Sequence, residues 1–204
     1  MRQPYTLLLR LEGPMQSWGY RSRFDYRDTA LEPTRSGVIG LICAAMGIAR
    51  SEDISRFDAI RMGVRVEKEG RPESDYQTAH DVAKASGDGT DTVISRRDYL
   101  ADASFTVGLQ CENLGLLEEI ALALRRPVWP LYLGRKAFPL AVPPLSPFDR
   151  PRPGTLEDFL GGAPGKRLML EAPDGERTQD DWPISFAERQ FMPRSVHSYV
   201  SGGA

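Results

Sequence analysis

Hydrophobic and polar positions alternate in three segments of the chain. In residues 5–12, leucines occupy every second position, at Leu7, Leu9 and Leu11. The same alternation returns in residues 61–67 and 103–111. Such a pattern is typical of a β-strand with one buried face. It therefore predicts three strands of one sheet.

Two other segments repeat hydrophobic residues at helical spacing. The first begins at Thr34 or Ser36, either of which can cap a helix, and ends at Gly47. The second follows Asn113, runs to Leu124 and is followed by two arginines. Side-chain oxygens at the start of a helix and cations at its end both stabilise it. Two helices with well-defined ends are predicted.

Between the second and third predicted strands the pattern is lost. Residues 74–97 are polar and have no sustained period. This segment is either a disordered loop or a two-stranded arm. An arm would turn at Asp88-Gly89, because Asp-Gly is a strong signal for a tight hairpin turn.

The order of these elements predicts an α+β fold. Strand, helix, strand, arm, strand, helix and strand follow one another as in the ferredoxin-like arrangement, which is also that of RNA-recognition motifs. We expect this ferredoxin-like (RRM-like) domain over residues 1–145, with a β-hairpin arm inserted at about 76–96. A smaller, irregular C-terminal extension, residues 146–204, would pack on the sheet and contain one strand at 167–171.

Composition excludes several classes of protein. The chain has 204 residues, 41% hydrophobic and 26% charged, which suits a globular protein rather than a disordered one. No segment has the roughly 18 apolar residues that a membrane span requires, and the first residues lack the features of a signal peptide. We therefore expect a cytoplasmic protein that does not bind membranes. The two cysteines, Cys43 and Cys111, are expected to be reduced structural thiols.

The distribution of charge is more informative than its sum. The formal net charge is −2, so the chain is not a uniformly basic nucleic-acid binder. Residues 171–181 hold five acids and one base, which leaves the rest of the chain slightly positive. An acidic outer face with local basic pockets is consistent with this distribution.

Motifs for catalysis or cofactor binding are absent from the sequence. It contains only two histidines, His80 and His197, and no cluster with the spacing of metal ligands. Nucleophile-elbow, P-loop and dinucleotide-binding motifs do not occur either. We expect no catalytic residues, no metal, no cofactor and no small-molecule substrate.

Three segments have the composition of a phosphate or nucleotide site. The loop 13–34 starts with the sequence GPMQSWG and interleaves aromatic residues with arginines, a combination that suits stacking and phosphate binding. At residues 33–37, a helix N-terminus would offer N–H groups, a hydroxyl and a guanidinium to a phosphate. In residues 132–136, a glycine would let backbone N–H groups approach an anion beside an arginine and a lysine.

Together, four ordered motifs resemble a known family. GPMQSWG, PTRSGVIGLICAAMGI, RRDYLADASFTVGL and PLYLGRKAFPL are similar to the CasD subunits of type I-E CRISPR Cascade complexes, which belong to the RAMP superfamily. The resemblance spans residues 3–145 and continues more faintly near the C-terminus. It implies a RAMP fold and a non-catalytic, RNA-binding subunit for antiviral defence.

The resemblance also implies partners and contact residues. Such a subunit caps the 5′ handle of the CRISPR RNA, sends its arm against the backbone subunit, abuts the large subunit, and meets target DNA only through the complex. The residues expected to contact the handle are Arg35, Ser36, Arg96, Arg97, Tyr132, Gly134, Arg135 and Lys136, with Gln16 and Trp18 as further candidates. For Trp18 an equally good alternative is that it packs the loop onto the sheet.

Two alternative functions remain open at this stage. The type I-C relative is a metal-independent ribonuclease that uses a tyrosine, a lysine and a histidine, and here His80, next to Asp81, could act as a base with Tyr99 or Tyr132. The other alternative is a protein-interaction module of the same fold, whose basic residues are all solvated surface.

Overall fold

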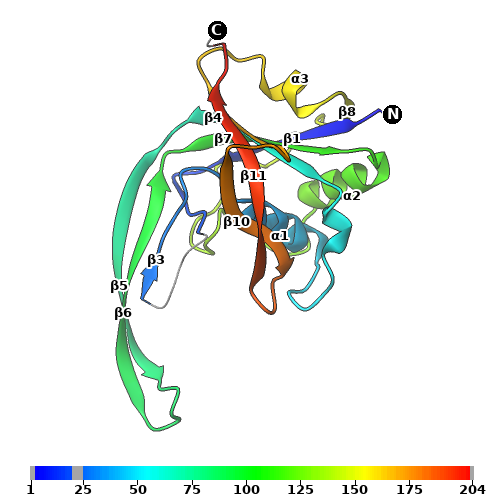
Figure 1. Cartoon of the computed structure of the whole chain (residues 1–204). Coiled ribbons are helices and arrows are strands. Elements are labelled where there is room, and N and C mark those ends of the chain that lie inside the picture. Colours follow the sequence, from blue (N-terminus) through cyan, green and yellow to red (C-terminus); the bar gives the residue numbers. More distant parts are fainter. Residues whose placement is uncertain (1–2, 20–24, 203–204) are drawn as a thin grey trace.

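The computed structural model describes residues 3–19 and 25–202 and contains two sheets (Figure 1). The larger has seven strands in the order β10-β11-β9-β4-β7-β1-β8. In chain order these are β1 (Tyr5–Glu12), β4 (Arg61–Lys68), β7 (Ser104–Cys111), β8 (Arg152–Pro153), β9 (Arg167–Glu171), β10 (Arg177–Ser185) and β11 (Gln190–Val200). The smaller sheet contains β2 (Met15–Gln16), β3 (Tyr26–Arg27), β5 (Arg71–Ala83) and β6 (Thr90–Ala101). The helices are α1 (Arg35–Met46), α2 (Leu114–Arg125) and α3 (Leu156–Leu160), with a 3-10 turn η1 at Ser55–Phe57.

The middle of the large sheet has the predicted ferredoxin-like topology. Strands β1, β4 and β7 and helices α1 and α2 lie where the sequence predicts them, in the order strand, helix, strand, arm, strand, helix. β7 pairs antiparallel with both β1 and β4. The fourth strand of the motif is reduced to β8, which pairs with β1 only at Tyr5 and Thr6. The predicted α+β fold is thus confirmed.

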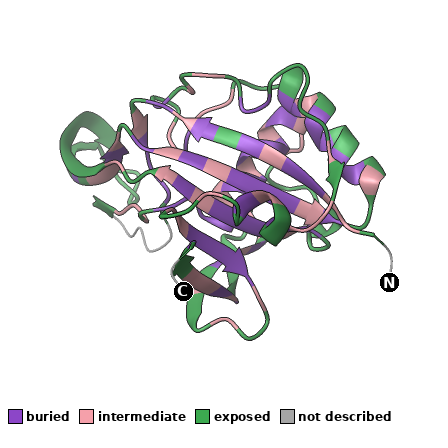
Figure 2. Cartoon of the chain, turned by 90° about the horizontal axis from the view of Figure 1, so that it is seen from above, coloured by how far each residue is buried: buried purple, intermediate pink, exposed green. Residues whose placement is uncertain are grey.

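The main core lies between the sheet and the two long helices. Leu7, Leu9 and Leu11 of β1 are fully buried, as the alternation predicts, and they belong to one cluster with Val38 of α1 and Leu117 of α2. Figure 2 shows buried and less buried positions alternating along the central strands. Burial of such side chains contributes roughly 1.5–3 kcal/mol each.

The predicted helix ends are confirmed, and so is the state of the cysteines. Thr34 caps α1 by accepting a hydrogen bond from the N–H of Gly37, and Gly47 ends the helix in the left-handed conformation. Asn113 caps α2 in the same way. Cys43 and Cys111 are both buried free thiols, and burial raises the pKa of the Cys43 thiol to about 11.

A second, smaller core lies on the other face of the sheet, under α3 (Figure 1). Its buried members are four leucines, Leu156, Leu160, Leu168 and Leu170. Gly63 makes room for them, because a Cβ at this position would lie 2.6 Å from Leu170 Cδ2. Helix α3 was not predicted, because its five residues are too few to show a helical period.

The segment between β4 and β7 is an arm, not a disordered loop. β5 and β6 pair antiparallel from Arg71 opposite Ala101 to Ala83 opposite Thr90, so the hairpin is longer than the predicted residues 76–96. Every residue of β5 is exposed. In Figure 1 the arm projects far from the rest of the molecule.

The prediction of an irregular C-terminal region is wrong for most of its length. The strand predicted at 167–171 is present as β9, and β10 and β11 follow it. β9 pairs with β4 and β11 pairs with β9, so this region extends the main sheet. The pairing of β10 with β11 shifts register twice, which breaks the alternation by which a strand is recognised in sequence. The described residues contain no helix long and apolar enough to cross a membrane.

Candidate nucleic-acid interface

The four sequence motifs, which are far apart in the chain, meet in space near the base of the arm. Met15 and Gln16 pair with Ala101 and Leu100 of β6. The backbone N–H of Ser17 donates to the carbonyl of Leu133 at 3.0 Å, which joins the first loop to the segment around Gly134. The N-terminus of α1 lies beneath this loop, against Trp18.

Gly134 fixes the contact between two of these segments. Its φ is +86°, in the left-handed region that favours glycine. A Cβ at this position would lie 1.7 Å from the carbonyl oxygen of Ser17. The Ser17 backbone therefore occupies the position that a side chain of residue 134 would take. The glycine is needed for the close approach of two loops, a use that differs from the expected approach to an anion.

Three arginines form a cationic cluster at the base of the arm: Arg27, Arg97 and Arg135. Arg27 of β3 lies opposite Arg97 of β6 in the parallel pairing of these strands. One terminal nitrogen of Arg135 donates to the carbonyl oxygens of Asp98 at 2.8 Å and Arg27 at 3.3 Å. Burial and the positive charges of Arg97 and Arg27 lower the pKa of the Arg135 guanidinium, against the smaller opposing effect of the carboxylates of Asp98 and Asp75. The guanidinium stays protonated at neutral pH, so the cluster concentrates positive charge.

The other predicted cations take different positions. Nε of Arg96 donates to Ser74 Oγ at 2.9 Å across the hairpin, whereas Nε of Arg97 donates to Ser95 Oγ at 2.9 Å. Successive strand residues point to opposite faces, so Arg96 lies on the face of the arm away from the cluster. Lys136 is exposed on the loop that carries Arg135. Arg27 belongs to the cluster but was not among the predicted contacts, although its loop of alternating aromatics and arginines was a signal.

Gln16 and Trp18 are buried and serve the packing of the loop. They are 0% and 1% exposed. Trp18 Nε1 donates to Gln16 Oε1 at 3.1 Å, and Gln16 Nε2 donates to the carbonyl of Ala103 at 2.9 Å. The Trp18 ring lies so close to Gly37 that a Cβ there would be 2.7 Å from its Cε3. The alternative that Trp18 packs the loop onto the domain is the one that the structure favours.

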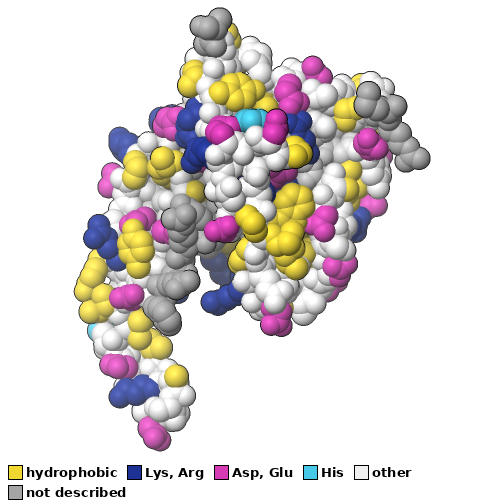
Figure 3. Space-filling model, in the orientation of Figure 1, with side chains coloured by type: hydrophobic (Ala, Val, Ile, Leu, Met, Phe, Trp, Pro, Cys, Tyr) yellow, Lys and Arg dark blue, Asp and Glu magenta, His cyan; other side chains and the backbone are white. Residues whose placement is uncertain are grey.

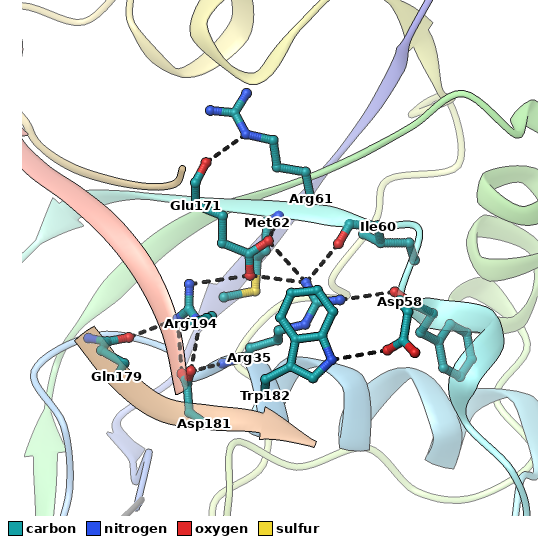
Figure 4. A network of polar contacts seen from close by, with 11 residues as sticks. Arg35, Asp58, Ile60, Arg61, Met62, Glu171, Gln179, Asp181, Trp182 and Arg194 are labelled. Atoms are coloured by element: carbon teal, nitrogen blue, oxygen red, sulfur yellow. Dashed lines mark hydrogen bonds and ion pairs between the residues drawn. The ribbon is translucent and has the colours of Figure 1, made fainter. Parts of the chain in front are cut away.

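Arg35 does not face a ligand either, which corrects the prediction for this residue (Figure 4). It is 1% exposed, and its Nη1 donates to Glu171 Oε1 at 3.0 Å and to the carbonyl of Ile60 at 2.7 Å. Its Nη2 donates to the carbonyl of Phe57 at 3.0 Å, and its guanidinium lies 3.6 Å from the centre of the Trp182 ring. Since protein groups surround the guanidinium, Arg35 holds the fold together.

The predicted phosphate site at the N-terminus of α1 is likewise already occupied by the protein. Oδ2 of Asp181, on β10, accepts the backbone N–H of Arg35 at 2.8 Å, and Thr34 Oγ1 accepts that of Gly37 at 3.2 Å. Arg194 of β11 completes the network by donating to Asp181 Oδ1 at 2.5 Å and pairing with Glu171 at 3.3 Å. A carboxylate of the chain thus takes the place that a phosphate would have at a free helix N-terminus.

A groove of about 460 Å³ runs along α1 beside the cationic cluster. Its walls include the predicted residues Ser36, Tyr132 and Gly134. Small residues of α1 form the floor and aromatic side chains form much of the rim: Gly37, Gly40, Ala44, Trp129, Phe186 and Phe191. Figure 3 shows hydrophobic side chains gathered around the β10–β11 hairpin, next to this groove. Flat apolar walls with a few hydroxyls suit an unstacked nucleobase.

The two histidines lie outside the cluster. His80 is on the arm, where its Nδ1 is 3.3 Å from Thr92 Oγ1. His197 of β11 contacts Glu176 and Asp174, and both carboxylates raise the pKa of its imidazole. Within the described residues, no group of three or more His, Cys, Asp and Glu side chains is arranged to hold a metal ion.

Comparisons with known proteins agree on one family. A family model described as CRISPR-associated protein (Cas_Cas5) matches residues 6–197. The CRISPR system Cascade subunit CasD of Escherichia coli (strain K12) is 36% identical over 155 residues, 67% of this chain and 68% of that protein.

Solved structures give the same result. A crystal structure of a Cas protein has a TM-score of 0.79 and 42% identity, covering 96% of this chain and 94% of that one. A chain in a CRISPR RNA-guided surveillance complex has a TM-score of 0.82 and 32% identity, covering 96% and 90% of the two chains.

The buried network predicts a large effect of changing Glu171. In Glu171→Gln, the charges of Arg35 and Arg194 lose a shared carboxylate, and uncompensated buried charge costs about 3–5 kcal/mol. Urea denaturation should show a loss of this size. The matched control is Glu157→Gln, because Glu157 pairs with Arg61 at 2.7 Å in a half-exposed position, where a loss below about 1 kcal/mol is expected. Equal losses in the two variants would contradict the role given to the network.

Proposed function

The chain belongs to the Cas5 family of CRISPR-associated proteins, and on this premise we propose that it is a non-catalytic subunit of a type I-E Cascade complex. In this role it holds and caps the 5′ handle of the CRISPR RNA during surveillance of foreign DNA. It contacts the backbone subunit through its arm and also abuts the large subunit.

The observation that carries this proposal is the cluster of Arg27, Arg97 and Arg135. Guanidinium groups bind phosphate through planar pairs of N–H donors. Hydrogen bonds to two backbone carbonyls hold Arg135 in place, so little side-chain entropy is lost when it meets a phosphate. Three neighbouring cations also suit single-stranded RNA, because its phosphates follow one another closely.

The groove along α1 supplies the second component of a site for single-stranded RNA. It opens next to Gly134, on the same loop as Arg135. A strand bound to the cluster would therefore have an apolar recess within reach of a base. Recognition of single-stranded RNA commonly combines phosphate contacts with bases stacked on aromatic side chains. Ser36 and Tyr132 offer hydroxyls to such a base.

The arm has the surface of a segment that binds a partner. Tyr76, Val93 and Ile94 are 66%, 43% and 46% exposed. A two-stranded hairpin with exposed hydrophobic side chains gains little stability by itself, and these side chains are open to a partner on both faces of the arm, because Val93 and Ile94 are successive strand residues. This supports the arm as the contact with the backbone subunit.

The position of the histidines supports a non-catalytic role. A general base must lie within hydrogen-bond reach of the hydroxyl that it deprotonates. His80 lies further along the arm than Tyr76, whose pairing partner is Arg96, and His197 is on β11. Neither therefore stands among the residues proposed to hold the RNA.

Removing single arginines of the cluster should weaken RNA retention without unfolding the protein. For Arg97→Ala and Arg135→Ala we expect roughly a tenfold loss of affinity for a 5′ handle RNA, as when a charged hydrogen bond is removed. The log–log slope of affinity against salt should fall by about 0.7 for each phosphate that is no longer neutralised. Filter binding measures both. Arg126→Ala, an exposed arginine at the end of α2, is the control and should leave both quantities unchanged.

Shortening the arm should separate folding from assembly. Replacing residues 80–92 with an Asn-Gly turn would connect Ala79 to Val93, which are partners in the hairpin. Because the removed part of β5 is entirely exposed, the melting temperature should stay within a few degrees. Co-purification with the backbone subunit should be weakened by the shortening, and abolished when Tyr76→Ser, Val93→Ser and Ile94→Ser are added, because these exposed side chains remain on the shortened arm. Normal assembly of the chain that carries all these changes would show that the arm is not the contact.

A cleavage assay distinguishes the proposed subunit from a processing nuclease. The purified chain is incubated with 5′-labelled repeat RNA, with and without EDTA, and the products are separated on a gel. We expect the RNA to be retained and intact. Cleavage that resists EDTA and disappears in His80→Ala would overturn the non-catalytic assignment.

A further inference from the structure

A second groove lies on the face of the large sheet opposite α1. Helix α3 covers one end of this face, and the other end is open as a groove of about 760 Å³. Four arginines line it, three from strands of the large sheet and one from the loop before β8: Arg10, Arg65, Arg152 and Arg150. The hydroxyls of Ser104 and Thr106 also line it.

The acidic groups of this groove are held by the protein. Glu67 Oε1 accepts hydrogen bonds from Arg65 Nε at 2.7 Å and Thr106 Oγ1 at 2.6 Å. Although burial opposes it, these bonds hold the pKa of Glu67 below its usual value. Asp149 Oδ2 accepts the backbone N–H of Ser146 at 2.7 Å. These carboxylates are therefore committed to neighbouring groups.

The arginines at the rim are oriented outward. Arg150 and Arg152 are exposed, and the Arg152 guanidinium lies 4.4 Å from the centre of the Phe159 ring, which orients it. On the sheet, Arg10 pairs with Glu12 but keeps 60% of its side chain exposed. Even with Glu12 counted beside Glu67 and Asp149, the four arginines leave the groove positive.

An exposed aromatic ring stands at the edge of this groove. Phe148 is 85% exposed, the most exposed of the large hydrophobic side chains in the described residues. Its turn is rigid, because the N–H of Asp149 donates to the carbonyl of Ser146 at 3.2 Å, and Arg125 donates to the carbonyls of Ser146 and Asp149. The protein thus keeps a flat apolar surface in water beside a row of guanidinium groups.

We propose that this groove binds single-stranded nucleic acid, with Phe148 stacked on a base and Arg150, Arg152 and Arg10 on the flanking phosphates. It is a second contact, separated by the sheet from the groove along α1. All its cations are arginines, which suit phosphate and stacking geometry. An apolar anchor for a protein partner is normally ringed by further apolar contacts. Phe148 follows Pro147, but Asp149 and Arg150 stand on its other side, and the groove that it borders is lined by four arginines against the two leucines Leu8 and Leu9.

The test measures the binding of fluorescent oligonucleotides of about 12 nucleotides, RNA and DNA separately, to the full chain. The chain carries Arg97→Ala and Arg135→Ala, which weaken the cationic cluster at the base of the arm. In that background Phe148→Leu should weaken binding at least about fivefold, and Phe148→Tyr should restore it, because stacking needs an aromatic ring. The double change Arg150→Ala and Arg152→Ala should lower the log–log salt slope by about 1.4. Arg126→Ala is the matched control for charge.

A second readout does not depend on affinity. Oligonucleotides with a photoreactive thio-base are crosslinked to the unmodified chain, and mass spectrometry should find the crosslink on the peptide that contains Phe148. The type of oligonucleotide that binds more strongly, RNA or DNA, identifies the nucleic acid that this groove takes. Unchanged affinity and slope in the groove variants, with no crosslink at Phe148, would overturn the proposal. So would loss of assembly with Cascade proteins while nucleic-acid binding stays intact, since the occupant would then be a protein segment.

Discussion

The fold depends on the neutralisation of two buried arginines by two carboxylates. Arg35 begins α1 and Arg194 lies on β11, while Glu171 ends β9 and Asp181 lies on β10. A desolvated guanidinium without a partner costs several kcal/mol, so only one placement of the C-terminal strands against α1 is stable. Glu171 also accepts the N–H of Met62, which ties β4 to the same point. The rim of the groove along α1 is therefore positioned by a charge network that is itself buried.

The proposed RNA site illustrates how a chain of net negative charge can bind a polyanion. Screening reduces interactions between exposed charges beyond about 8 Å at physiological salt, so nearby groups decide the local potential. At the base of the arm, β3 and β6 bring Arg27 and Arg97 side by side, and the loop of Gly134 adds Arg135. Two of the five acids in residues 171–181 do not belong to an acidic outer face, since Glu171 and Asp181 are buried in the protein.

Periodicity predicted the elements whose burial is regular: β1, β4, β7, α1 and α2 with their caps. It failed for β10 and β11, where register shifts and one proline in each strand, Pro183 and Pro193, interrupt the alternation. The residues that the resemblance assigned to RNA contact also fall into two groups, those that the structure brings together and those that it buries elsewhere. Arg97 and Arg135 are brought together, whereas Arg35 finds its partner at Glu171, 136 positions away in the chain. Nothing local in the sequence marks that pair, although an acid directly after the apolar run of β9 is a signal of a buried cationic partner.

The distance along the chain between Arg35 and its carboxylates has a consequence for how the protein is made. Arg35 leaves the ribosome long before Glu171 and Asp181, and the start of α1 waits for a carboxylate 146 positions later. Until then, closing the main core would leave an unpaired charge in it. Pairings of such sequence separation form late and slowly. The N-terminal motif can thus reach its final packing around Arg35 only after β9–β11 have been made, so this part of the fold is completed late, when nearly the whole chain is present.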